Sequence, residues 1–191
     1  MIKEYIDNQV FGNKDFTISP LVRGEYENCS FINCEFFNAD LSEISFIDCL
    51  FDTCNLSMAK MINSALRGVK FKGCKMLGLN FGKCNQFGLT ASFDNCNLNH
   101  SSFFRTKFKK TSFKSDKLQE VDFTECDLSG SAFEYCDLTH AIFERSILEK
   151  TDFRTAINYS INPETNRIKK AKFSTSGIAG LLDKYDIEIE Q

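Results

Sequence analysis

Large apolar side chains recur at every fifth position over most of this 191-residue chain. One series runs at intervals of five from Phe31 to Phe81, and a second series, displaced by two residues, runs from Phe93 to Phe153. Neither the 3.6-residue period of an α-helix nor the two-residue period of a flat strand produces this spacing. The simplest geometry is a short extended side followed by a turn, with one large side chain pointing inward on each side.

A small residue, most often Cys, Ser, Thr or Ala, stands two positions before most of the large ones. Positions two apart lie on the same face of an extended segment, so both should point inward. The other three positions of each unit are mainly Asn, Asp, Glu, Lys or Ser, which suit turns and solvent. Each five-residue unit therefore has two inward and three outward positions.

The identity of the large residue repeats after twenty positions, because the residues at 93, 113, 133 and 153 are all Phe. This repetition implies four sides per coil, with like residues stacked on successive coils about 4.8 Å apart. Cysteines at the small positions should form a second inward column. The expected structural core therefore includes Phe93, Phe113, Phe133, Phe153, Cys34, Cys54, Cys74 and Cys96.

Two of the five-residue units, Ala39–Glu43 and Cys126–Gly130, read small, Asp, Leu, polar, polar. With the long run of similar units over residues 24–173, they resemble the pentapeptide-repeat family. The resemblance implies an all-β fold, a right-handed quadrilateral parallel β-helix. It leaves the function open, because members of one fold family can serve many functions.

We expect one domain over residues 1–191, with a degenerate N-terminal cap at 1–25, repeat coils at 26–173, and a C-terminal helix and tail at 174–191. In the cap the large residues keep their phase, but the positions two before them depart from the pattern, as at Gln9 and Lys14. Such a cap shields the open end of a solenoid.

Twelve residues separate Phe81 from Phe93, where the pattern requires ten. This difference predicts a two-residue bulge or small loop. The expected large residue would fall at Gln86, so we expect Phe87 to take the interior place instead.

The C-terminal segment differs in kind from the repeats. A Ser-Thr-Ser-Gly start at Ser174–Gly177 favours a short helix with one apolar stripe, and the following alternation of Ile with acidic residues is typical of a strand. Such a segment either caps its own core or pairs with a second copy, and we favour an isologous homodimer. The expected dimer residues are Ile178, Leu181, Leu182, Tyr185, Ile187 and Ile189.

The start of the ladder at Tyr26–Phe31 and the ending Lys172–Ile187 are similar to the Qnr-type quinolone-resistance subgroup. The resemblance implies dimeric rods joined through C-terminal elements. It also implies binding of DNA gyrase and topoisomerase IV by DNA mimicry, through an acidic surface. Some members project two loops, but Phe46 to Leu66 runs uninterrupted, and a second loop is at most the bulge at 86–91.

We expect no catalysis, cofactor or metal. The sequence has no nucleophile elbow, P-loop or HExxH motif, and its nine Cys form no CxxC pair. His100, Glu120 and His140 share an outward column, which two solvated histidines explain more simply than a metal. With no signal peptide or membrane-spanning stretch, we expect a cytoplasmic protein without a membrane or small-molecule partner.

Net charge is only −3, but it is unevenly distributed. Residues 1–55 have ten acids and three bases, residues 56–114 one acid and eleven bases, and residues 115–153 ten acids and three bases. Solvated charges could account for these bands, or the bands could steer a partner of opposite charge.

The third band is the expected partner-binding surface. This acidic band consists of Asp116, Glu120, Asp122, Glu125, Asp127, Glu134, Asp137, Glu144, Glu149 and Asp152. Asp116 is an anomaly, because it occupies an inward position, where it should bond to nearby backbone.

Residues 56–114 form a basic waist that opposes DNA mimicry along the full rod. Its cations include Lys70, Lys72, Lys75, Lys83, Arg105, Lys107, Lys109, Lys110 and Lys114. Three functions remain open: a Qnr-like protein that binds a type II topoisomerase, a scaffold for an unrelated protein partner, and a nucleic-acid binder that uses the basic waist.

Overall fold

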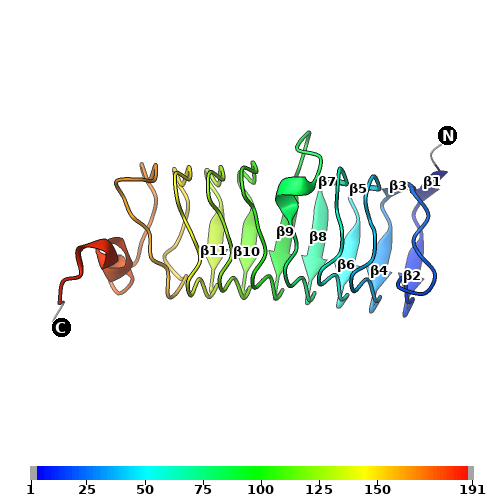
Figure 1. Ribbon diagram of the computed structural model, residues 1–191, viewed down its shortest axis with the longest axis horizontal. Coiled ribbons are helices and arrows are strands. Elements are labelled where there is room, and N and C mark those ends of the chain that lie inside the picture. Colours follow the sequence, from blue (N-terminus) through cyan, green and yellow to red (C-terminus); the bar gives the residue numbers. More distant parts are fainter. Residues whose placement is uncertain (1–3, 189–191) are drawn as a thin grey trace.

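The computed structural model describes residues 4–188 and shows a four-sided coil that stacks into a rod (Figure 1). One face, here the β1 face, is a four-stranded parallel sheet in the order β1-β3-β5-β7. Its strands are β1 (Glu4–Asp7), β3 (Gly24–Glu27), β5 (Ser45–Ile47) and β7 (Ala65–Arg67). The first coil thus begins within the segment predicted as a cap.

A second face, the β2 face, is a seven-stranded parallel sheet in the order β2-β4-β6-β8-β9-β10-β11. Its strands are β2 (Val10–Gly12), β4 (Ser30–Ile32), β6 (Leu50–Asp52), β8 (Val69–Lys72), β9 (Ala91–Asp94), β10 (Ser112–Lys114) and β11 (Ala132–Glu134). Isolated parallel bridges twenty residues apart continue the other faces, for example Asn97 with Lys117 and Asp122 with Ile142. The predicted fold class is confirmed.

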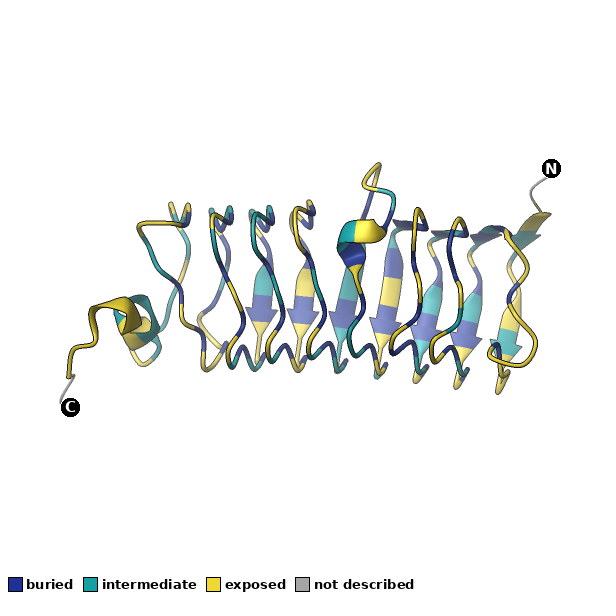
Figure 2. Cartoon of the chain, viewed as in Figure 1, coloured by how far each residue is buried: buried dark blue, intermediate teal, exposed yellow. Residues whose placement is uncertain are grey.

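Large residues stack in vertical register inside the rod, and Figure 2 shows the resulting alternation of buried and outward positions. Phe113 pairs with Phe133 across β10 and β11, and their rings lie 4.7 Å apart at 1°. The Phe93 and Phe113 rings are 5.1 Å apart. All eight predicted core residues are buried.

The small inward residues also donate hydrogen bonds. The Sγ of Cys54 donates to the Phe31 carbonyl oxygen at 3.2 Å, and the Oγ of Ser146 donates to the Phe123 carbonyl oxygen at 2.8 Å. Each acceptor belongs to a large residue on the preceding coil. A thiol or hydroxyl therefore fits this position better than a methyl group, because it satisfies a buried carbonyl.

The two-residue insertion forms a loop that projects from the rod, next to the 3-10 helix η1 (Phe81–Lys83) (Figure 1). Val69 pairs with Ala91, a spacing of twenty-two, so the extra residues lie on the β1 face just before β9. The expectation that Phe87 points inward is wrong: Phe87 is 79% exposed, and Leu89 is buried in its place. We call residues 85–90 the Phe87 loop.

The C-terminal segment forms two 3-10 helices, η2 (Ile178–Leu181) and η3 (Asp183–Tyr185), where the sequence predicted one short helix. Gly180 faces the Tyr159 backbone so closely that a side chain would overlap it. The Ile161 N–H donates to the Gly180 carbonyl oxygen at 2.8 Å, so this segment is fixed to the end of the solenoid. Residues 186–188 form no strand, and Ile189 lies outside the described residues.

Candidate interaction surface

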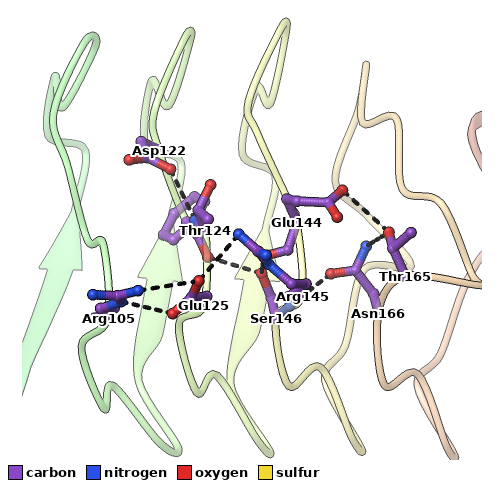
Figure 3. A network of polar contacts seen from close by, with 10 residues as sticks. Arg105, Asp122, Thr124, Glu125, Glu144, Arg145, Ser146, Thr165 and Asn166 are labelled. Atoms are coloured by element: carbon purple, nitrogen blue, oxygen red, sulfur yellow. Dashed lines mark hydrogen bonds and ion pairs between the residues drawn. The ribbon is translucent and has the colours of Figure 1, made fainter.

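Four of the ten acids of the predicted acidic band, Glu125, Asp127, Glu149 and Asp152, are ion-paired with Lys or Arg. Figure 3 shows Glu125 between Arg105 and Arg145, with N–O distances of 2.6 and 3.1 Å. The hydrogen bond from Arg105 is the main cause that lowers the pKa of Glu125. All three residues stand at corners, one coil apart, and each has a positive φ. Stacking at a spacing of twenty therefore creates a base–acid–base column.

Three further acids of the band have basic partners within 3.0 Å. Asp127 pairs with Lys109 at 3.0 Å, Glu149 with Arg167 at 2.7 Å, and Asp152 with Arg154 at 2.7 Å. These pairs reduce the negative charge that the band presents to a partner.

Asp137 is held by neutral donors. Burial opposes its ionisation, but hydrogen bonds from Thr139, Asn158 and Gln119 outweigh burial and lower its pKa to about 2. Its oxygens are therefore occupied, with Gln119 Nε2 at 2.7 Å and Asn158 Nδ2 at 2.9 Å. The acids of the band that face solvent most openly are Glu120 and Glu134.

Asp116 is removed from the predicted surface, because only 1% of the residue is exposed. Its Oδ1 accepts the Cys96 N–H at 2.7 Å, and its Oδ2 accepts the Lys114 N–H at 3.0 Å. Burial raises the pKa of Asp116 to about 7, and the two backbone hydrogen bonds oppose that rise. A carboxyl group in this position cannot contact a partner.

The basic waist retains more unpaired charge. Among the described residues, eight of the eleven cations in residues 56–114 have no carboxylate within ion-pair distance. The three paired ones are Lys72, Arg105 and Lys109. The sequence showed the excess of bases in this band, but the pairing depends on which coils are neighbours.

The residues predicted at a dimer interface divide into two groups. Ile178, Tyr185 and Ile187 are each at least half exposed, whereas Leu181 is partly buried and packs against the core. Leu182 is also partly buried. The segment therefore covers the last coil with one side and presents apolar side chains on the other.

A cavity of about 650 Å³ lies between the last coil and the C-terminal helices. Its lining includes Tyr135, Arg154 and Asp183, and contains neither His nor Cys. His100 Nδ1 lies 3.2 Å from Glu120, and residues 4–188 contain no cluster of three potential metal ligands. No helix in the same range is long and apolar enough to cross a membrane.

A family model described as "Pentapeptide repeat region" matches residues 25–90 and 89–153. A trypsin-treated form of QnrB1, a plasmid-mediated fluoroquinolone resistance protein, is 19% identical, with a TM-score of 0.71 over 98% of this chain and 92% of that one. Full-length QnrB1 is 18% identical, with a TM-score of 0.62 over 96% of this chain and 100% of that one. No curated protein matches the sequence.

Proposed function

This chain belongs to the pentapeptide-repeat family, and we propose that it is a non-catalytic interaction protein that binds a type II topoisomerase and protects it from quinolones. The observation that carries the proposal is the likeness to QnrB1 over 98% of the chain. The packed interior supports it as well, because it leaves only the outer surface for binding. Surface recognition by a rigid rod requires no cofactor.

The proposed contact is the acidic band, and within it the exposed Glu120 and Glu134. The ion pairs of Glu125, Asp127, Glu149 and Asp152 favour a second candidate, a scaffold for an unrelated protein partner. These pairs reduce the resemblance of the band to a phosphate backbone.

A gyrase supercoiling assay with a fluoroquinolone tests the proposal. We expect the protein to restore supercoiling, and the double substitution Glu120→Lys/Glu134→Lys to weaken the effect. Glu4→Lys, an exposed acid at the far end of the rod, is the matched control. Absence of any effect at micromolar protein would exclude topoisomerase protection, and full activity of the double variant would place the contact elsewhere.

We also propose a homodimer through the C-terminal segment, formed by Ile178, Tyr185 and Ile187. Light scattering after size exclusion should give twice the 21.8 kDa chain mass. Ile178→Asp should give the monomer mass, whereas Ile62→Asp, at a similarly exposed Ile (58% against 52%), should not. A wild-type chain that is monomeric at micromolar concentration would contradict this part of the proposal.

The proposal places the chain in the cytoplasm. All nine cysteines are free and buried, and such a compartment keeps thiols reduced.

A further inference from the structure

The Phe87 loop presents an aromatic side chain that the proposed function does not use. Phe87 is 79% exposed, although large apolar side chains elsewhere in the loop region are buried. The Arg67 guanidinium carbon lies 5.7 Å from the centre of its ring. Arg67 Nε is buried and has no hydrogen-bond partner among the described residues. The guanidinium is therefore positioned beside the ring without being neutralised by the protein.

Further cations lie on the coils before and after the loop. Arg67 lies at the end of β7 and Lys70 on β8, one coil before the loop. Across the insertion, residues that face each other on neighbouring coils are twenty-two positions apart, as Lys75 and Asn97 are. This spacing places Lys107 on the coil after the loop. Lys110 stands at the next corner along the chain, where its φ is positive. We call Arg67, Lys70, Phe87, Lys107 and Lys110 the loop patch.

No cation of the loop patch has a carboxylate within 4.0 Å among residues 4–188. In the acidic band, by contrast, single acids have several basic partners: Glu125 is paired with both Arg105 and Arg145. An unpaired cluster of cations attracts polyanions, and the attraction weakens as salt rises. The loop patch therefore favours a negatively charged partner.

The exposed ring decides between classes of polyanion. Proteins that bind single-stranded nucleic acid combine cations along the backbone with aromatic side chains on which bases stack. The loop patch extends over three coils, about 10 Å from first to last at the usual interstrand spacing, which matches a few nucleotides. Proteins that recognise the base sequence of a duplex insert an α-helix or a two-stranded β-ribbon into the major groove, and this surface provides neither.

We propose that the loop patch binds single-stranded nucleic acid, with a base stacked on Phe87 and phosphates held by Arg67, Lys70, Lys107 and Lys110. This activity is independent of topoisomerase protection, because it uses a different surface from the acidic band.

Fluorescence anisotropy of a labelled oligothymidylate, measured with the full chain at low salt, tests the proposal. We expect saturable binding that weakens steeply with added salt. Phe87→Ala should raise the dissociation constant about fivefold or more, the range for losing one stacked base. The matched control is Phe37→Ala, which removes a 52%-exposed ring from the N-terminal part of the rod and should leave binding unchanged.

Several outcomes would overturn the proposal. Equal affinities of wild type and Phe87→Ala would show that the loop is not the binding surface. Equal or tighter binding of a duplex would exclude a single-strand site. Preference for polyglutamate, with no binding of the oligonucleotide, would identify an acidic protein as the partner. Circular dichroism spectra of both variants should match the wild type, because both side chains are exposed on the outside of the rod.

Discussion

The buried Asp116 should make the stability of this protein depend on pH in a predictable direction. Other small inward residues donate a proton to a carbonyl on the preceding coil. Asn166 shows the pattern for an amide: its Oδ1 accepts the Ser146 N–H at 2.8 Å, and its Nδ2 donates to the Phe143 carbonyl oxygen at 2.8 Å. An ionised Asp116 accepts the equivalent N–H of Cys96 but has no proton to donate. Its second oxygen, Oδ2, accepts the Lys114 N–H at 3.0 Å, so Asp116 pairs with two backbone donors and with no carbonyl oxygen.

The expected magnitude follows from the pKa of Asp116, which burial raises to about 7. The unfolded value is about 3.9, so the folded state retains a proton that the unfolded chain has released. The contribution to stability is complete below about pH 4, falls as the pH rises, and is lost above about pH 7. The total change is about 4 kcal/mol, of which about 3 kcal/mol falls between pH 5 and pH 8.

Asp116→Asn removes this titration and keeps an amide oxygen that can accept the Cys96 N–H, as the Asn166 Oδ1 accepts the Ser146 N–H. Relative to wild type, the variant should therefore gain about 3 kcal/mol of unfolding free energy between pH 5 and pH 8. Urea denaturation followed by circular dichroism at several pH values measures the difference. Asp122→Asn, at a half-buried acid on the outside of the rod, is the control and should show a much smaller change.

Parallel pH profiles of wild type and Asp116→Asn would refute the reasoning. Such a result would mean that water or the surrounding backbone compensates the buried carboxylate.

Three further changes test other parts of the structure. Phe123→Ala, at a fully buried ring stacked 5.0 Å from its neighbour on each adjoining coil, should lower the unfolding free energy by about 3–5 kcal/mol in urea denaturation. Gly180→Ala would place a Cβ against the Tyr159 backbone, so we expect faster proteolysis of the C-terminal segment than in wild type. Lys114→Glu would face an acid on each neighbouring strand and should cost about 1 kcal/mol at low salt, less at high salt, by thermal denaturation.

The sequence was sufficient to predict the coil and its register. A five-residue period with identity at twenty positions admits one stacking, which puts Phe113 over Phe133, as observed. This inference is strong because a shift of register would move large residues out of the column and leave small ones in their place. The hydrogen bonds of the small inward residues were not predicted, although the frequency of Cys, Ser and Thr at these positions was the available signal.

The predictions failed where the period is interrupted. In the Phe87 loop two apolar residues compete for one interior place, and the pattern cannot say that Leu89, not Phe87, occupies it. In the C-terminal segment the apolar stripe suggested one continuous helix. Gly177 and Gly180 weaken helix formation there, and both pack against Tyr159. Contact with the last coil thus decided the local structure, and such contacts are not visible in a sequence window.

Charge was the least predictable property, because neighbours along the chain are not neighbours in space. On the β2 face, facing strands carry an alternating column of acids and bases: Asp52, Lys72, Asp94, Lys114 and Glu134. Sequence windows assign these residues to three bands of opposite sign, yet each has opposite charges beside it. Where such columns are continuous, the net charge counted over a sequence window overstates the electrostatic field at the surface, because opposite charges on neighbouring coils offset one another. The Phe87 loop interrupts the columns of the β1 face. Arg67, on the coil before the loop, has no acid within ion-pair distance among the described residues, and Lys107, on the coil after it, faces Asp127, whose carboxylate is paired with Lys109. The surface best able to attract a charged partner is therefore expected where the repeat fails.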